Sequence, residues 1–205
     1  MTRIAVIDHG AGNLVSIAQG LERAGATITI AETPGDLAGA DGVVLPGVGS
    51  TGAAMRRLEQ TDFVSPLQQL DLPLLGICVG LQLFFESSDE DGASCLGLMK
   101  GRVEKLSAAP KLPHIGWNDL TIGRPDSLFV GIGRDAPFYF VHSFAVAPTD
   151  EAVVVATTAY GRPFVAAVRD GRRVGVQFHP ERSGPDGLRV LANFVAECGE
   201  AADAA

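Results

Sequence analysis

The sequence has no feature of a membrane-spanning or nucleic-acid-binding protein. No apolar run approaches the ~20 residues that a transmembrane helix needs. Positive charge is scarce, with 16 Lys and Arg against 24 Asp and Glu and a net charge of -8. Because a surface that binds the phosphate backbone must be basic, we expect neither nucleic acid nor an anionic membrane as a partner.

Cysteine is scarce too, and its spacing excludes both a disulfide framework and a zinc site. The three cysteines, Cys78, Cys95 and Cys198, are odd in number and widely separated, with no CxxC pair. An apolar run starts at Ile4 without the layout of a signal peptide. We therefore expect a cytoplasmic protein with reduced thiols and without a metal site.

A nucleotide cofactor is not expected either. Gly10 and Gly12 resemble the start of a dinucleotide fingerprint, but its third glycine would fall at Val15. These glycines are better explained as a place where backbone amides line a cleft at a helix N-terminus.

The apolar pattern predicts an α/β fold of one domain, residues 1–199, followed by a frayed tail, residues 200–205. Apolar runs with the length of buried strands occur at residues 4–8, 27–31, 42–45 and 72–77. Helical spacing of apolar residues follows three of them. Strands that alternate with helices form right-handed βαβ units, so we expect a mainly parallel central sheet flanked by helices. Sites in such sheets gather at the carboxyl ends of the strands.

The C-terminal half has a different pattern, which predicts added antiparallel strands. Strand-like runs at residues 101–106, 138–142 and 153–156 are separated by loops rich in Pro and Gly. Asp170-Gly171 between two further runs predicts a tight hairpin turn. A last helix carries an apolar stripe of Leu188, Leu191, Ala192 and Val195.

The fourth predicted strand ends in a candidate nucleophile, Cys78, in the motif Gly76-Ile77-Cys78-Val79-Gly80. A strand, a tight turn and a helix with the reactive residue at the turn form the G-x-S-x-G elbow, here with sulfur in place of oxygen. The flanking glycines let strand and helix approach each other, and the helix N-terminus favours the thiolate. A small buried cysteine at a strand end explains this stretch, taken alone, equally well.

A base and an orienting acid for this cysteine are predicted at His179 and Glu181. Pro180 keeps the backbone of His179 extended, and in an extended chain residues i and i+2 point the same way. The Glu181 carboxylate is therefore placed to hold the imidazole tautomer and to stabilise the imidazolium, as in a Cys–His–acid triad. The alternative is a surface loop without catalytic function.

An oxyanion hole needs N–H donors near the sulfur. Val79, the residue after the nucleophile, supplies one, and the loop Pro46-Gly47-Val48-Gly49 is the natural source of the second. The glycines of this loop would let a peptide unit flip, so that the hole forms on demand. The alternative is an ordinary turn at a strand end.

The residues around Cys78 and His179 resemble those of the class I (triad) glutamine amidotransferases. The shared motifs are GICVGLQ at residues 76–82 and the late HPE at residues 179–181. Five further segments narrow the resemblance to a subfamily of glutaminase subunits in histidine biosynthesis. They span almost the whole chain: DHGAGN (8–13), LPGVG (45–49), PHIGWN (113–118), FVHSF (140–144) and GVQFHPERSG (175–184).

The resemblance implies that Cys78 attacks the side-chain amide of L-glutamine, forming a glutamyl thioester and releasing ammonia. His179 would move protons, Glu181 would orient it, and water would then hydrolyse the thioester. Positions that match the family's glutamine contacts are Gln82, Glu90, His142, Ser143 and Phe144. Without that match, the acidic run around Glu90 would be taken for a solvated loop.

The resemblance also implies a partner, a cyclase subunit with a (β/α)8 barrel that forms a heterodimer with this chain and receives the ammonia. The residues expected at the interface are Gly10, Asn13, Trp117, Asn118 and Arg182. A lone Trp between glycine and asparagine suits a partner surface. The alternatives are a core aromatic for Trp117 and a solvated charge for Arg182.

The sequence departs from the family pattern at several positions without losing a triad member. His9 replaces a common Tyr, Val79 a common Leu and Phe144 a frequent Tyr. Ser50 and Thr51 follow the oxyanion loop where a small residue and then an aromatic one are usual. This chain could therefore differ from the family in the behaviour of its oxyanion loop and in the lack of a hydroxyl contact at Phe144.

Two rival functions remain at the level of sequence. One is a glutaminase subunit of another pathway, such as pyridoxal phosphate or purine synthesis. Trp117-Asn118 and the segment 140–144 argue against it. The other is a binding module that keeps the fold without the chemistry, against which the complete set of Cys78, His179 and Glu181 speaks.

Overall fold

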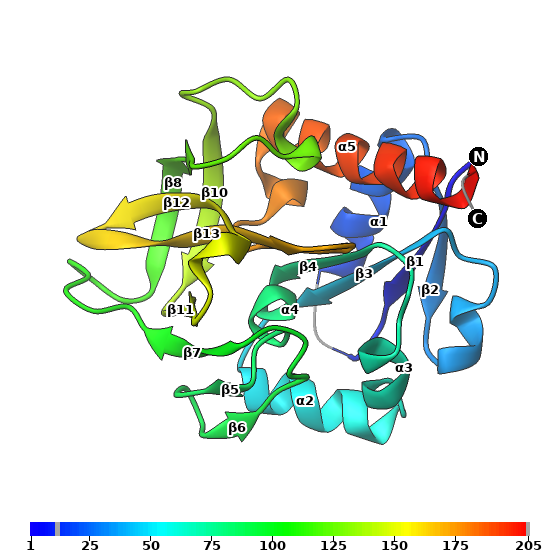
Figure 1. The fold of residues 1–205 in the computed structure, drawn as a ribbon, viewed down its shortest axis with the longest axis horizontal. Coiled ribbons are helices and arrows are strands. Elements are labelled where there is room, and N and C mark those ends of the chain that lie inside the picture. Colours follow the sequence, from blue (N-terminus) through cyan, green and yellow to red (C-terminus); the bar gives the residue numbers. More distant parts are fainter. Residues whose placement is uncertain (11–12, 204–205) are drawn as a thin grey trace.

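The computed structural model describes residues 1–10 and 13–203, which are built around a sheet of eight strands (Figure 1). Its larger part is parallel, in the order β2 (Thr27–Ala31), β1 (Arg3–Ile7), β3 (Gly42–Gly47), β4 (Leu74–Cys78) and β14 (Arg173–Val176). Antiparallel strands continue it: β13 (Arg162–Asp170), β12 (Val154–Tyr160) and β9 (Thr121–Ile122). The predicted mainly parallel sheet with added antiparallel strands is thus confirmed.

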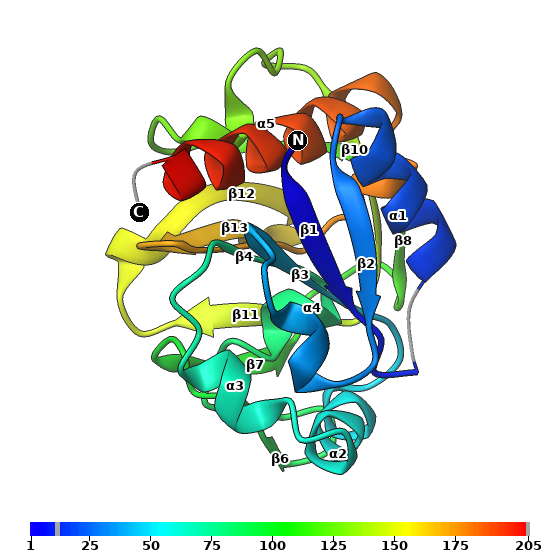
Figure 2. The ribbon, with the colours of Figure 1, turned by 90° about the vertical axis from the view of Figure 1, so that its right-hand side faces the viewer.

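Helices cover both faces of this sheet. On one face α1 (Leu14–Arg23) packs against the long helix α5 (Gly184–Asp203), as Figure 2 shows. On the other side lie α2 (Thr51–Gln60), α3 (Val64–Gln68) and α4 (Val79–Gln82). Helix α1 begins where the Asn13 side chain accepts a hydrogen bond from the Ser16 amide, and it buries Ile17 and Leu21. Among the described helices, none is long and apolar enough to cross a membrane.

Two smaller sheets lie beside the antiparallel end of the main sheet (Figure 1). One pairs β8 (His114–Asp119) with β10 (Pro137–His142). The other has the order β11 (Phe144–Pro148), β7 (Gly101–Lys105), β5 (Ser87–Ser88) and β6 (Ala93–Ser94). Short 3-10 turns complete the described chain: η1 (Pro34–Leu37), η2 (Ser127–Phe129), η3 (Glu151–Val153) and η4 (Pro180–Arg182).

Several elements differ from the expectations drawn from the sequence. Pro46 and Gly47, predicted in a loop, are the last residues of β3, and Gly47 is paired with Cys78 of β4. The stripe predicted on α5 is rotated, because Leu188 and Ala192 are only half-buried. The residues that face the core are Val190, Leu191, Phe194, Val195 and Cys198.

Strand β8 was not predicted, because the usual inward orientation of apolar residues is inverted there. Ile115 and Trp117 are 60% and 54% exposed, while His114 is buried. At the other end of the chain, the residues predicted as a frayed tail are helical as far as Asp203. Residues 204–205, like Gly12 of the predicted cleft, lie outside the described residues.

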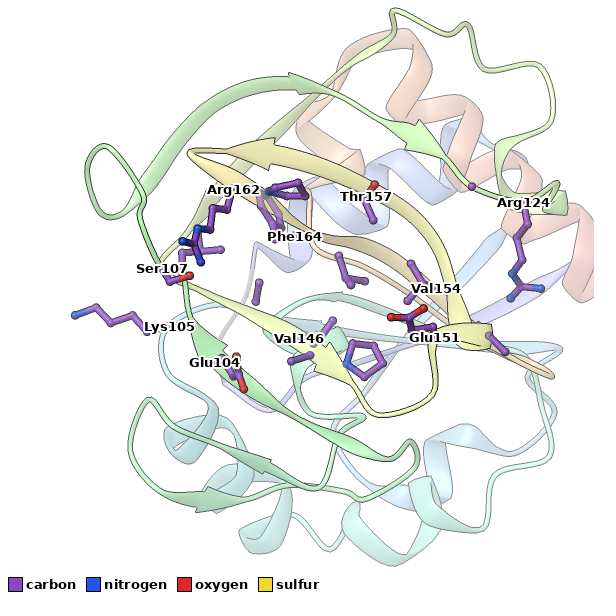
Figure 3. Close-up of a pocket in the computed structure, with 18 residues that line it drawn as sticks. Glu104, Lys105, Ser107, Arg124, Val146, Glu151, Val154, Thr157, Arg162 and Phe164 are labelled. Atoms are coloured by element: carbon purple, nitrogen blue, oxygen red, sulfur yellow. The ribbon is translucent and has the colours of Figure 1, made fainter.

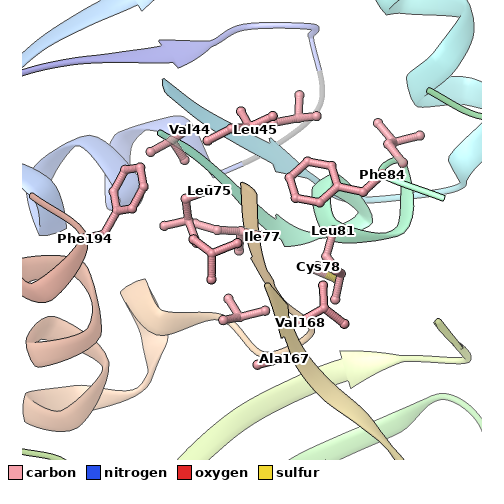
Figure 4. Packing of buried hydrophobic residues seen from close by; sticks show 14 of the residues in the cluster. Val44, Leu45, Leu75, Ile77, Cys78, Leu81, Phe84, Ala167, Val168 and Phe194 are labelled. Atoms are coloured by element: carbon pink, nitrogen blue, oxygen red, sulfur yellow. The ribbon is translucent and has the colours of Figure 1, made fainter. Parts of the chain in front are cut away.

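The core fixes the carboxyl ends of the central strands. All residues of β3 and β4 are buried. These strands pack between Phe194 of α5 on one face and Phe84, which follows α4, on the other (Figure 4). A Cβ on Gly80 would overlap the carbonyl oxygen of Leu45, so α4 meets β3 backbone against backbone. The turn that carries Cys78 is therefore held in place from both sides.

The contact at Gly80 predicts a large cost for a single methyl group. We expect Gly80→Ala to lower the free energy of unfolding by about 1–3 kcal/mol, because the turn must move off β3. Gly133→Ala is the matched control, since a Cβ there meets nothing within 4 Å, and we expect it to change stability by less than about 0.5 kcal/mol. Urea denaturation measures both. Equal midpoints for the two variants would show that the turn is not held by β3.

Candidate active site

The candidate nucleophile lies in a strained turn. Cys78 is the last residue of β4 and the N-cap of α4, with φ 56° and ψ -109°. Such a conformation costs a residue with a side chain of order 1–3 kcal/mol and persists only where its surroundings impose it. The helix that follows is shorter than the apolar spacing predicted, at 4 residues. The sulfur therefore meets the amides of a single turn and not the dipole of a long helix.

The sheet order brings His179 to the same edge as Cys78. Strand β14 is the parallel neighbour of β4 and is paired with it along its length, so the two chains leave the sheet side by side. His179 has an extended backbone, φ -101° and ψ 94°, before Pro180. Its Nδ1 donates to Glu181 Oε1 at 2.9 Å, and the Glu181 side chain is fully buried. The structure thus places the three predicted triad residues together.

Opposing effects set the charge of His179. Burial alone lowers the pKa of its imidazole, but the adjacent Cys78 sulfur and Glu181 carboxylate raise it more, to about 10. An imidazolium that faces a thiolate is the reactive form of a cysteine nucleophile. Among the described residues, Nε2 of His179 has no hydrogen-bond partner. Nε2 therefore remains available to a substrate.

Gln177 is a further polar contact of the sulfur, and the sequence did not reveal it. Its buried amide donates from Nε2 to Cys78 Sγ at 3.5 Å. Its Oε1 accepts from Gln82 Nε2 at 3.1 Å, and this nitrogen also donates to the Phe144 carbonyl at 2.9 Å. The pattern that points to it is a polar residue directly after the buried strand β14 and two positions before His179, since in extended chain residues i and i+2 share a face.

The cleft beside Cys78 encloses about 260 Å³. Most predicted site residues line it: Val48, Gly49, Cys78, Val79, Gln82, Glu90, His142, Ser143, Phe144 and His179. This volume is smaller than that of pockets for drug-sized ligands and suits a small amino acid. Gly47, the last residue of β3, is not among the lining residues.

The loop after β3 contributes backbone with little bulk to this cleft. Gly49 has φ 87°, and Val48 is 42% exposed. A Cβ on Gly47 would lie 2.8 Å from Val79 Cβ and 2.9 Å from the Gly80 amide nitrogen, so only glycine lets β3 approach the elbow here. Val48, Gly49 and Val79 therefore line one cleft, where an oxyanion hole would need their backbone amides.

In the acidic run near the cleft, Glu90 is half-buried and caps a helix, while Asp89 and Asp91 are exposed. Glu90 Oε2 accepts from the Thr51 amide at 3.1 Å, at the start of α2. Asp91 accepts from Thr51 Oγ1 at 3.2 Å and from the Gly52 amide at 2.9 Å. Burial raises the pKa of Glu90, with the neighbouring Asp91 charge acting in the same direction.

His142 forms a neutral wall of the cleft. Burial lowers its pKa to about 4, against the opposing effect of the Phe144 carbonyl, to which Nδ1 donates at 2.8 Å. Its Nε2 lies 3.4 Å from Nδ1 of His114, whose pKa burial also lowers. Of the histidines near the cleft, His179 is thus the one that carries charge at neutral pH.

Two of the predicted interface residues form an exposed patch with Tyr139. Trp117 is 54% exposed and meets the Tyr139 ring edge-on, with 5.7 Å between ring centroids. The Arg182 guanidinium lies over the same ring, 4.4 Å from its centroid. Trp117 is therefore not a core aromatic, and Arg182 is ordered against an aromatic surface.

The other predicted interface residues use their polar groups within the chain. Asn118 accepts from His114 Nε2 at 2.8 Å and donates to the Ala159 carbonyl at 2.9 Å. Asn13 caps α1, and the exposed Gly10 accepts from Arg57. The Asn13 and Asn118 side chains and the Gly10 carbonyl thus hold their own segments in place.

A larger cavity of about 680 Å³ lies elsewhere, between the β7–β11 sheet and strands β12 and β13 (Figure 3). Charged residues of both signs line it, among them Glu104, Glu151, Arg124 and Arg162. None of the predicted catalytic or glutamine-binding residues is present there. In the described part of the chain, no group of three or more His, Cys, Asp or Glu residues could hold a metal ion.

The sequence matches known proteins along its length. The family described as glutamine amidotransferase class-I matches residues 5–198. The imidazole glycerol phosphate synthase subunit HisH of Moorella thermoacetica is 46% identical over 198 residues, covering 95% of this chain and 94% of that protein. The subunit of the same name from Synechococcus sp. (strain JA-3-3Ab) is 46% identical over 200 residues, covering 94% and 93%. A solved glutamine amidotransferase structure, 20% identical, shares the fold with a TM-score of 0.72 over 96% of this chain and 98% of that chain.

The charge balance at His179 predicts the effect of removing its carboxylate. In Glu181→Gln the pKa of His179 falls, because the neutral amide no longer stabilises the imidazolium, so the ring activates the Cys78 sulfur less at neutral pH. We expect the rate of Cys78 alkylation by iodoacetamide at neutral pH to fall ~10-fold, the equivalent of about one pKa unit. Mass spectrometry of peptides resolves this thiol from the others. Burial raises the pKa of Cys95 to about 11 and that of Cys198 to about 12, so both should react slowly.

The exposed Glu200 of α5 offers the control variant, Glu200→Gln, which removes the same charge far from the cleft. Its alkylation rate should equal that of the unmodified protein. An unchanged rate in Glu181→Gln would contradict a role of this carboxylate in charging the imidazole.

Proposed function

This chain belongs to the class-I glutamine amidotransferase family, and we propose that it is the glutaminase subunit of an imidazole glycerol phosphate synthase. It hydrolyses L-glutamine to glutamate and ammonia for histidine biosynthesis. The observation that carries this proposal is Cys78 at a positive-φ elbow, in one small cleft with His179 and its Glu181 partner. The two relatives of 46% identity support the pathway.

The geometry supports a two-step reaction. The Cys78 thiolate attacks the side-chain carbonyl carbon of glutamine, and the charge that develops on the oxygen is bound by amides of Val79, Val48 and Gly49. His179 Nε2 gives its proton to the nitrogen as the C–N bond breaks, which releases ammonia and leaves a glutamyl thioester. His179 then takes a proton from water, which attacks the thioester and frees glutamate. Throughout, Glu181 holds the ring at Nδ1.

The wall of the cleft supplies recognition of glutamine. Gln82 uses Nε2 on the Phe144 carbonyl and on Gln177, so its Oε1 is the atom left to accept a bond from the substrate. The Glu90 carboxylate at the cleft suits the α-ammonium group. His142, Ser143 and Phe144 also line the cleft, and the neutral His142 adds no charge to it.

The ammonia passes to a cyclase subunit with a (β/α)8 barrel, and the two chains form a heterodimer. The cyclase uses it to make imidazole glycerol phosphate and an aminoimidazole carboxamide ribonucleotide. The exposed Trp117 and the ordered Arg182 support a docking surface for this partner, with Gly10, Asn13 and Asn118 beside it. A pyridoxal phosphate or purine pathway would need a different acceptor subunit, and the names of the relatives favour histidine biosynthesis.

Residues 1–199 act as one glutamine amidotransferase domain in this proposal, since the family match runs from residue 5 to residue 198. We place the enzyme in the cytoplasm, where amino-acid biosynthesis takes place. The free thiols of Cys78, Cys95 and Cys198 are consistent with a reducing compartment.

The nucleophile assignment is tested by Cys78→Ala in the complex with the cyclase subunit. We expect glutamine hydrolysis to fall at least ~1,000-fold, because the covalent route is lost. The cyclase reaction supplied with ammonium salt instead of glutamine should proceed at the unmodified rate. Cys95→Ala, at a half-buried thiol outside the cleft, is the control and should retain full glutaminase activity. Substantial glutamine turnover by Cys78→Ala would refute the proposed nucleophile.

A further inference from the structure

His9 lies just beyond β1, with its ring buried against the base of the loop that lines the cleft. It is 2% exposed, and its Nε2 lies 2.6 Å from the carbonyl oxygen of Pro46 in β3. A carbonyl oxygen only accepts, so Nε2 carries the hydrogen and donates it. Nδ1 is buried too and has no hydrogen-bond partner among the described residues. The bond to Pro46 is thus the one polar contact of this ring with the described chain.

Burial favours the neutral form of His9. Burial has the largest effect and lowers the pKa of the imidazole, the Pro46 carbonyl and Asp8 raise it, and the Arg57 cation lowers it. Arg57 Nη1 also donates to the carbonyl of His9 at 3.4 Å and to that of Gly10. The segment that carries His9 is therefore tied to α2 as well as to β3.

The direction of the Pro46 carbonyl sets the direction of the next amide. Strands β1 and β4 lie on opposite sides of β3 in the sheet. In a trans peptide the C=O and N–H groups point in opposite directions. A carbonyl turned toward His9, on the β1 side, therefore turns the Gly47 N–H toward β4, where Gly47 is paired with Cys78. The bond from His9 fixes the last peptide unit before the chain enters the cleft.

The loop beyond this peptide unit is held at its ends and free in its middle. Val48 and Gly49 make no hydrogen bond to any other described residue. A Cβ on Gly49 would meet nothing within 4 Å. The next fixed residue is Ser50, the N-cap of α2, whose Oγ accepts from the Ala53 amide at 3.3 Å, and the Thr51 amide then donates to Glu90 at 3.1 Å. The position of the Val48 and Gly49 amides thus depends on the anchor at Pro46 on one side and on the cap of α2 on the other.

We propose that His9 is a positioning residue of the glutaminase reaction. By donating Nε2–H to the Pro46 carbonyl, it fixes the peptide unit from which the chain runs on to the Val48 and Gly49 amides, which bind the oxyanion. This inference rests on the proposed function. A donor misplaced by about 1 Å from the developing charge loses much of its effect on the rate. Loss of the bond therefore lowers kcat and leaves KM for glutamine, which depends on other residues, nearly unchanged.

The matched variants His9→Gln and His9→Asn test this role in the complex with the cyclase subunit. The amide nitrogen of Gln takes the place of Nε2 and reaches Pro46, whereas that of Asn takes the place of Nδ1 and falls short. We expect kcat of His9→Asn to fall ~10-fold or more with KM within ~2-fold, and kcat of His9→Gln to stay within ~3-fold of the unmodified complex. Alkylation of Cys78 by iodoacetamide needs no oxyanion hole, and its rate should be the same in all three proteins.

The possible outcomes separate this inference from the proposed function. Equal kcat values for the two variants in an active complex would overturn the role of His9 alone. A loss of kcat matched by an equal loss of alkylation would also overturn it, because that result reports general disorder of the site. If the unmodified complex fails to hydrolyse glutamine, both proposals fall. His9→Phe fills the same space without a hydrogen-bond donor and should show the same loss of kcat as His9→Asn. If His9→Asn does not fold, His9→Phe takes its place in the comparison.

Discussion

The site depends on one steric constraint, the direct packing of the turn after Cys78 against the two central strands. A Cβ on Gly80 would overlap the Leu45 carbonyl, and a Cβ on Gly76 would lie 2.7 Å from Phe84 and 2.8 Å from the Leu81 amide. Because both positions are glycine, α4 can sit on β3 and β4 without an intervening side chain. Cys78, which lies between Gly76 and Gly80 in the sequence, must then take a positive φ, which residues with a side chain rarely adopt. This geometry sends the sulfur out of the sheet edge and into the cleft.

The remaining groups of the site gain their properties from burial next to that sulfur. His179 and Glu181 form a buried pair, and the charge of Cys78 and of Glu181 keeps the pKa of the imidazole high in spite of its burial. His142, at the same cleft without a carboxylate partner, is kept neutral by the same burial. Nε2 of His179 and Oε2 of Glu181 lack hydrogen-bond partners among the described residues. Burying these unpaired atoms costs folding free energy, but it leaves Nε2 free to donate and Oε2 free to accept during the reaction.

The sequence predicts the parts of this site that follow local rules. The glycines around Cys78 indicate the elbow, and Pro180 places His179 and Glu181 on one side of an extended chain. The parallel order of the strands then brings both segments to one edge. What could not be predicted are contacts between distant positions, such as Glu90 with Thr51, His9 with Pro46 and Gln177 with Cys78. Each joins residues at least 37 positions apart in the sequence, and the spacing of residues along the chain does not predict such a contact. Strand β8 could not be predicted for another reason: its apolar residues face outward.

The central claim is that the elbow presents Cys78 to glutamine, and we propose that the loop at residues 48–49, which makes no hydrogen bond to the described chain, completes the oxyanion hole only when the partner is bound. Its most direct test is labelling with a diazoketone analogue of glutamine, with the modified residue mapped, in the presence and absence of the cyclase subunit and its acceptor ligand. The account predicts labelling at Cys78 and not at Cys95 or Cys198. It also predicts a rate ~100-fold higher in the liganded complex, the size of effect that one oxyanion donor typically has. Labelling at another residue would contradict the site, and equal rates with and without the partner would contradict completion of the loop by the partner.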